Sequence, residues 1–241
     1  MRFGLWLALA VFGTALLPNL SKAEEAPWEF RLTPYVWVPA LSLESKIGTN
    51  PSTDGDSSIL DFLDFGFLAT GEIRKGNWGL ILEFNYLDLG ADATYLGGRF
   101  GAEADLTGVM GGVAVDYRFF KNDRFAADVF GGVRVWSLEA RIDFNTLPTA
   151  SQTKTWADPL VGARAGYDIN KNFFIDGLVD VGGFGVGSDL QWEALARVGY
   201  RLNKTMSLAL GYRHLFLDFS DDKLVINTTM TGPFLAVDFN W

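Results

Sequence analysis

The chain has 241 residues, of which 49% are hydrophobic and 20% charged, and it contains no cysteine and a single histidine. The absence of cysteine excludes a disulfide framework, a thiolate metal site and a cysteine nucleophile, and one histidine disfavours a zinc enzyme. The formal net charge of −9 disfavours nucleic-acid binding, which needs a basic surface. We expect no nucleic-acid partner, no cofactor and no metal.

Residues 1–23 have the pattern of an export signal. Arg2 gives the positive start, an apolar run extends from Leu5 to Leu17, and Ala23 ends a small-x-small cleavage site. The run is shorter than the ~20 residues of a membrane-spanning helix. We predict cleavage near Ala23 and export of residues 24–241, which contain no apolar segment long enough for a spanning helix.

From Trp28 onward, apolar and polar residues alternate with period two, which indicates strands with two different faces. Most of the segments exceed the roughly 9–11 residues that a tilted strand needs to cross a bilayer. The ten predicted segments lie around residues 28–38, 63–74, 78–86, 104–120, 124–144, 155–169, 173–186, 190–202, 206–219 and 226–241.

The connections between these segments alternate between short and long. The short ones contain Asn or Gly, which tolerate tight hairpin turns. They are residues 75–77, 121–123, 170–172 and 203–205, whereas the longer or more polar ones are 47–58, 92–103, 145–154, 187–189 and 220–224. Short turns on one side are typical of bacterial outer-membrane barrels, where they face the periplasm. We predict an all-β, single antiparallel transmembrane β-barrel of ten strands, with eight or twelve as alternatives.

The polar face of these strands is rich in arginine, whereas every lysine after residue 23 lies in a predicted turn or loop. A solvated face would mix the two, but an enclosed face favours arginine, whose planar fork pairs with carboxylates. We therefore predict a charged lumen and a lipid-facing apolar surface. The predicted lumen network consists of Arg31, Glu72, Arg74, Glu83, Asp116, Arg118, Asp128, Arg134, Asp158, Arg164, Asp168, Asp176, Asp180, Glu193, Arg197, Arg201, Arg213 and Asp238.

Aromatic residues recur at the ends of the predicted strands. Tyr117, Tyr167 and Tyr200 each precede a short turn on the apolar face, as in the aromatic girdle of a membrane barrel. The last segment alternates up to Trp241, and a terminal aromatic resembles the assembly signal of bacterial outer-membrane proteins. We expect the barrel-assembly machinery to recognise this last strand.

Several segments are similar to segments of one group of bacterial proteins: Leu32–Trp37, Ser58–Phe65, Arg74–Leu80, Gly211–Arg213 and Gly232–Leu235. By these segments the chain resembles proteobacterial outer-membrane β-barrel proteins of the broad OmpA-type neighbourhood. The resemblance spans most of residues 24–241 and implies an integral outer-membrane barrel, in a group where most members have no assigned activity. Such proteins often carry Tyr where this chain has His214, which argues against a shared catalytic histidine.

Three features could carry chemistry, and each has a simpler interpretation. His214 is the only candidate general base, but strand parity aligns it with Tyr212 and Phe216 on the lipid side. Asp54 and Asp56 hint at calcium, but the segment lacks the longer ligand series of a calcium loop. We predict an interfacial ring at His214 and a polar loop at 53–63, in which Ser57 or Ser58 caps a short helical turn.

The lumen could form either an ion-selective pore or a salt-bridged plug. Ten strands lie close to the number at which side chains fill the interior. Bulky residues predicted to point inward would fill it further: Trp37, Phe130, Trp136 and Phe184. The sequence favours the plug.

The sequence therefore predicts a non-enzymatic outer-membrane barrel with a structural or surface-interaction role. A narrow passive channel for small solutes is the alternative, and an outer-membrane protease or lipid hydrolase is the third possibility. We expect outer-membrane lipids and lipopolysaccharide as its neighbours, whereas the sequence leaves the oligomeric state open.

Overall fold

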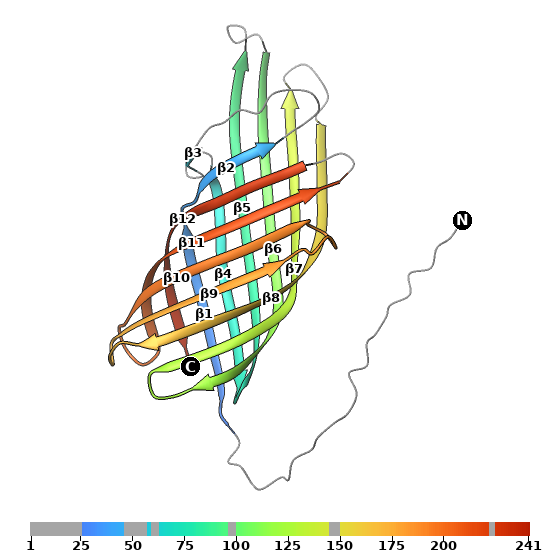
Figure 1. The fold of residues 1–241 in the computed structure, drawn as a ribbon. Coiled ribbons are helices and arrows are strands. Elements are labelled where there is room, and N and C mark those ends of the chain that lie inside the picture. The colour runs from blue at the N-terminus through green and yellow to red at the C-terminus, as the bar shows by residue number, and fades with distance from the viewer. Residues whose placement is uncertain (1–25, 46–56, 59–62, 96–99, 145–149, 222–224) are drawn as a thin grey trace, which may run out of the picture.

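The computed structural model describes residues 26–45, 57–58, 63–95, 100–144, 150–221 and 225–241 (Figure 1). The predicted export signal and the two loop aspartates, Asp54 and Asp56, lie outside these ranges. The strands are β1 (Trp28–Trp37), β2 (Ala40–Ser45), β3 (Ser57–Ser58), β4 (Leu63–Lys75), β5 (Trp78–Tyr95), β6 (Phe100–Lys121), β7 (Phe125–Phe144), β8 (Ala150–Asp168), β9 (Phe173–Gly182), β10 (Leu190–Arg201), β11 (Met206–Ser220) and β12 (Val225–Asn240).

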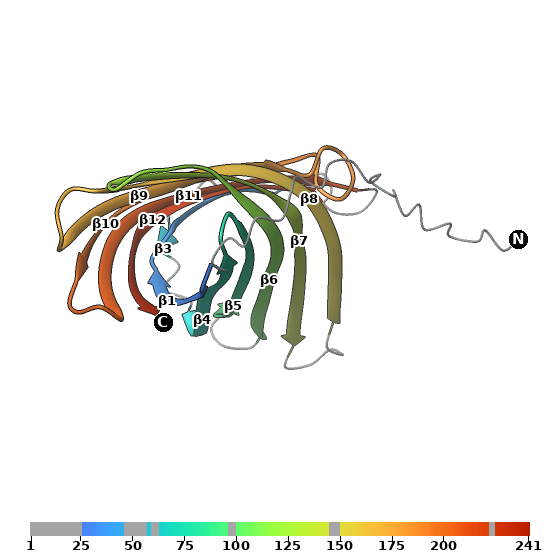
Figure 2. The same ribbon diagram turned by 90° about the horizontal axis from the view of Figure 1, so that it is seen from below.

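Ten of these strands form a closed antiparallel barrel, as predicted. β1 pairs with β4, each later strand pairs with the next, and β12 pairs back with β1, where Val36 lies opposite Leu235. β2 continues along β12 after a break at Val38 and Pro39, where proline lacks the N–H donor that a ladder needs. Viewed from the end, the strands arch around one interior (Figure 2). The described part of the chain contains no helix long and apolar enough to cross a membrane.

The four short turns lie where the sequence predicts them, at the end of the barrel that holds the C-terminus (Figure 1). Local hydrogen bonds explain three of them. The Asn122 side-chain oxygen accepts hydrogen bonds from the backbone N–H groups of Arg124 (2.9 Å) and Phe125 (2.7 Å), and Asn170 and Asn203 make the equivalent bonds. The fourth turn contains Gly76 with φ +62°.

At the opposite end, the boundaries differ from the predictions. Within the predicted loops at 92–103 and 145–154, the described residues 92–95, 100–103 and 150–154 are strand, because β5 to β8 continue well beyond their neighbours (Figure 1). In contrast, the predicted strand at 173–186 ends at Gly182, where the backbone enters a turn with φ +88° at Gly183 and +71° at Gly185. Ser57 and Ser58 form β3 beside β2, whereas the short helical turn that one of them is predicted to cap falls on 59–62, outside the described residues.

The outward face of the barrel is an apolar band. On β6 the band extends from Tyr117 to Val109, a length close to the roughly 9–11 residues that a tilted strand needs to cross a bilayer. Its exposed aliphatic and aromatic side chains include Leu32, Val36, Leu82, Phe84, Val113, Val115, Val129, Val133, Val161, Ile175, Val179, Val198, Leu208, Leu210 and Leu235. Farther along β7 and β8, the exposed positions become polar, as at Glu139 and Thr153.

An aromatic belt surrounds the short-turn end of this band. The ring centroids of Trp78 and Tyr117 lie 4.8 Å apart, and those of Phe173 and Tyr200 lie 4.9 Å apart. The belt consists of Trp28, Phe30, Trp78, Tyr117, Tyr167, Phe173, Tyr200 and Trp241. The three tyrosines singled out in the sequence therefore lie at one level beside the turns.

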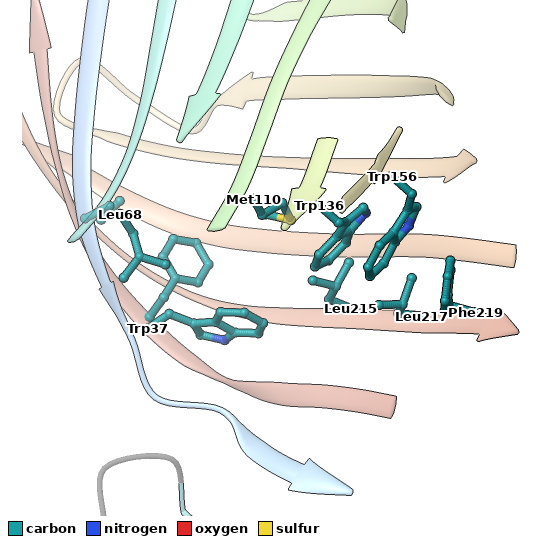
Figure 3. Packing of buried hydrophobic residues seen from close by; sticks show 11 residues of the cluster. Trp37, Leu68, Met110, Trp136, Trp156, Leu215, Leu217 and Phe219 are labelled. Atoms are coloured by element: carbon teal, nitrogen blue, oxygen red, sulfur yellow. The ribbon is translucent and has the colours of Figure 1, made fainter. Parts of the chain in front are cut away.

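The inward face contains an apolar layer in the half of the barrel toward the long connections (Figure 3). Trp156 on β8 stacks against Phe219 on β11, with 4.2 Å between ring centroids, and Trp136 on β7 lies parallel to Trp156. The buried side chains of the layer include Trp37, Leu68, Met110, Trp136, Trp156, Leu215, Leu217, Phe219 and Phe234. Phe130 also points inward, where its ring packs against Gly162. Phe184 does not, because it is 55% exposed in the turn after β9, with φ +52°.

Candidate functional site in the barrel lumen

Arginine–carboxylate contacts bridge the lumen at mid-height. The Arg134 guanidinium on β7 contacts Glu83 on β5, Asp180 on β9 and Glu193 on β10, with 3.1 Å to each carboxylate. Arg213 on β11 contacts Glu83 and Glu193 at 2.9 Å. We call these five residues the ionic layer. Because its members come from opposite walls, their side chains cross the interior.

The ionic layer is joined to neutral partners. Arg213 donates a hydrogen bond of 2.7 Å to the Tyr35 hydroxyl, which in turn donates one of 2.5 Å to Asn85. The Arg213 guanidinium also lies 4.7 Å from the Trp37 ring centroid, in contact with the apolar layer. The two layers are therefore in contact through Arg213, whose buried charge has carboxylate, hydroxyl and aromatic partners.

A second ionic group lies nearer the short turns, on β4 to β8. Arg164 binds Glu72 with two hydrogen bonds of 2.7 and 2.8 Å and contacts Asp116 and Asp128 at 2.9 Å. Arg74 bonds Asp116 and also contacts Asp128. Arg118 reaches Asp128 at 2.8 Å, and Arg31 lies 3.8 Å from Glu72.

The opposite wall carries a third ionic group. Arg197 on β10 contacts Asp176 on β9 at 2.7 Å and Asp238 on β12 at 2.8 Å. Arg201 on β10 pairs with Asp168 on β8, past the intervening β9, and lies over the Phe174 ring, which fills the space above Gly199. Alternate strand positions thus place these side chains in the interior.

Asp158 is inside the barrel but differs from the other predicted network members. It has no arginine or lysine partner among the described residues. Its carboxylate instead accepts hydrogen bonds from the Ser188 backbone N–H (2.6 Å) and hydroxyl (2.7 Å) and from the Trp156 indole (3.2 Å). Asp158 therefore holds the β9–β10 connection inside the mouth of the barrel. Each of the other predicted residues has an oppositely charged partner.

The predicted network contains only charged residues, whereas neutral residues also line the lumen. Strand parity places Thr33 on the polar face with Arg31, and Asn85 on the polar face with Glu83. The same parity, continued along β1, could have placed Tyr35 inside. No periodic signal marks Ser188, because it lies in an irregular connection.

A blind cavity of about 540 Å³ lies between the second and third ionic groups, and we call it the vestibule. Residues of two short turns line one end of it, including Lys121 and Lys204. Arg134 and Arg213 of the ionic layer line its other end. The vestibule therefore opens at the short-turn end and is bounded within the barrel by the ionic layer.

His214 lies on the outer surface, as strand parity predicts. Its ring stacks on Trp192, with 4.4 Å between ring centroids, and its Nδ1 atom is 2.7 Å from the Thr231 hydroxyl. The residues around it form no group of three or more histidine or acidic side chains within the described ranges. The ring has the position expected for an interfacial aromatic side chain.

No protein-family model matches the sequence, and no curated protein matches it. The fold is similar to solved structures of outer-membrane proteins. The attachment invasion locus protein Ail of Yersinia pestis, solved with the heparin analogue sucrose octasulfate, has 14% identity and a TM-score of 0.47, with 89% of this chain and 99% of that chain covered. The outer membrane protease OmpT of Escherichia coli has 7% identity and a TM-score of 0.49, with 90% and 94% covered. The transport unit of the E. coli autotransporter AIDA-I has 9% identity and a TM-score of 0.47, with 93% of each chain covered.

Proposed function

We propose that this protein is an integral outer-membrane barrel whose lumen is filled by side chains and whose role is structural or surface-interacting. The observation that carries the proposal is the ionic layer, in which Arg134 and Arg213 join strands on opposite sides of the barrel. The layer supports a non-conducting barrel, because its charges satisfy one another instead of lining an open path.

The outer surface supports a membrane location. An exposed apolar band of this size is rare on soluble proteins, and closed barrels are one of the two structures that can span a bilayer. The aromatic belt lies at one edge of the band, where indole and phenol rings can meet lipid headgroups. We propose that outer-membrane lipids and lipopolysaccharide surround the band, and that the assembly machinery recognises β12 and the terminal Trp241.

The strand extension supports a surface role. β5 to β8 rise beyond the rest of the barrel at the end opposite the short turns (Figure 1). β9 pairs with β8 only from Leu160 onward, and the connection after β9 covers the next residues, where Gly183 donates a backbone hydrogen bond to Pro159 and Gly187 packs against Ala157. In the described residues no strand pairs with the β9-facing edge of residues 150–156. A free strand edge offers backbone donors and acceptors to an extended segment of another protein. We propose that this extension projects from the cell surface and makes the interactions.

Two other functions are less well supported. A narrow channel would use the vestibule as its entrance, but solutes would then have to pass both the ionic layer and the stacked rings of Trp136, Trp156 and Phe219. A protease or lipid hydrolase would need His214 in a cleft with a carboxylate that orients it, but the ring lies on the outer face, stacked on Trp192, and the one hydrogen-bond partner shown for it among the described residues is the Thr231 hydroxyl. We therefore propose a protein without enzymatic activity.

The test begins with fractionation of membranes and with gel mobility before and after heating, which together establish membrane residence and a folded barrel. Planar-bilayer recordings on the same purified sample then measure conduction. We expect a heat-modifiable band from the outer membrane and no stable large conductance. A large and stable conductance would overturn the filled-lumen proposal, whereas a monomer that stays soluble without detergent would overturn the membrane location.

A further inference from the structure

At the mouth of the vestibule, cationic side chains outnumber the carboxylates that lie beside them. The cations at this end are Arg31, Lys121, Arg124, Arg201 and Lys204, and the carboxylates beside them are Asp123, Asp168 and, near Arg31 and Lys204, Glu29 and Glu72. Asp168 is already paired with Arg201. This local excess of positive charge stands against a net charge of −9 for the whole chain.

Several of these cations have hydrogen-bond donors to spare. Within the described part of the chain, Lys121, Arg124 and Lys204 are exposed and have no ion-pair partner. The Arg31 side chain is 45% exposed, and its distance of 3.8 Å to Glu72 is too long for a hydrogen bond. Its remaining side-chain bond, from Nε, goes to Asn240 at 3.0 Å.

The carboxylates deeper in the vestibule, by contrast, already have arginine partners. Glu72 accepts two hydrogen bonds from Arg164, and Asp128 contacts three arginines, of which Arg118 is the closest at 2.8 Å. On the other wall, Asp238 binds Arg197 and the Thr33 hydroxyl. These deeper acids have partners of their own, whereas Lys121, Arg124 and Lys204 at the mouth have no ion-pair partner among the described residues.

These cations come from different parts of the wall. Arg31 lies on β1 and Lys204 in the β10–β11 turn, whereas Lys121 and Arg124 belong to the β6–β7 turn. An anion with two charged groups could therefore contact both sides at once. The volume of about 540 Å³ is within the range of roughly 300–1,000 Å³ that is usual for small-molecule sites.

We propose that the vestibule is a binding site for a soluble small anion that carries at least two negative charges, of the phosphate or polycarboxylate class. Arg31 and Lys204 hold one end of the anion, and Lys121 and Arg124 hold the other. The site does not require conduction, since the ligand enters and leaves by the short-turn end.

The test is calorimetric titration of residues 24–241 with pyrophosphate as the probe. The protein is kept in uncharged detergent micelles at constant ionic strength. We expect saturable binding that the double variant Arg31→Gln/Lys204→Gln weakens at least about tenfold, since it removes two charge-assisted contacts. Lys171→Gln is the matched control, because Lys171 is an exposed short-turn lysine that does not line the vestibule. We expect it to bind as the wild type does, and we expect Arg31→Lys/Lys204→Arg to retain binding.

Four results would overturn the proposal. The first is no saturable binding, and the second is equal displacement by chloride at matched ionic strength. The third is an equal loss in Lys171→Gln, which would indicate a diffuse surface field. The fourth is displacement of pyrophosphate by phosphatidylglycerol in mixed micelles, which would assign the site to a lipid headgroup. Heat-modifiable gel mobility shows that each variant is folded, so a folding failure cannot be mistaken for lost binding.

Discussion

Arg134 on β7 and Glu193 on β10 meet across the interior of the barrel, with 3.1 Å between Nη2 and Oε2. Both side chains are buried, and three carboxylates surround the one guanidinium. The contact joins two strands that are not neighbours in the sheet, so it bridges the lumen and ties the walls together.

Removal of the Arg134 charge should destabilise the barrel strongly. Arg134→Gln leaves Glu83, Asp180 and Glu193 buried with too few cations, and breaking a buried ion pair costs about 3–5 kcal/mol. The free energy of unfolding, measured by urea titration in phospholipid vesicles, checks this expectation. Arg31→Gln is the control, because its exposed ion pair should contribute under about 1 kcal/mol. Equal losses in the two variants would show that the ionic layer is not a structural element.

The apolar layer and the ionic layer should act as two barriers in series. The triple variant Trp136→Ala/Trp156→Ala/Phe219→Ala empties much of the apolar layer but leaves the bridging arginines in place. We expect this variant, once folded, to remain closed in planar-bilayer recordings. A stable conductance in the triple variant, absent from the wild type, would mean that the ionic layer does not block the lumen.

An arginine placed in the middle of the apolar band should be costly in a membrane. Val113 is 47% exposed, midway between Tyr117 and Val109 on the outward face of β6. Val113→Arg should lower the free energy of unfolding in vesicles by about 2–4 kcal/mol, the cost of arginine at the bilayer midplane.

Thr153→Arg gives the matched comparison for the band. Thr153 is exposed on β8, beyond the band in the extension, where an arginine would meet water. We expect its effect to stay within about 0.5 kcal/mol. A similar cost at both positions would contradict the assignment of the band to lipid.

The β9–β10 connection should loosen when its bond to Asp158 is weakened. Ser188→Ala removes the hydroxyl that donates to Asp158 at 2.7 Å, which should cost about 1–3 kcal/mol because the acceptor is a buried charge. Chymotrypsin should then cleave faster after the exposed Phe184, as measured on the folded protein by gel electrophoresis. Ser151→Ala, on an exposed part of β8, should leave the cleavage rate unchanged. Unchanged cleavage in Ser188→Ala would show that the bond does not hold the connection.

Strand parity predicts the face of the barrel on which a strand residue lies, but it does not predict which residues contact each other. Parity alone sets Arg134 and Glu193 on the inward face, because successive side chains of a strand point to opposite sides. It does not state that they meet, since the tilt of the strands and their stagger decide which inward positions reach the same height. For the same reason the sequence grouped Asp158 with the arginines, although its partner is Ser188.

The strand ends show a similar division. The turn at Asn170 was predictable because an Asn side chain bonds the backbone of the next residues. The end of β9 was not, because residues 183–186 continue to alternate while the backbone at Gly183 and Phe184 has already turned to positive φ. Local alternation cannot reveal that a neighbouring strand has ceased to offer a partner.

The sequence by itself determined the class of fold, the ten strands of the barrel and the two faces on which their alternate side chains lie, because these follow from the two-residue period and from local turn chemistry. Only the tertiary structure decided that the lumen is bridged, that the vestibule is open at one end and that a loop serine binds Asp158. These features depend on the closure and stagger of the barrel, which bring together residues far apart in the chain. A local sequence pattern does not specify such contacts.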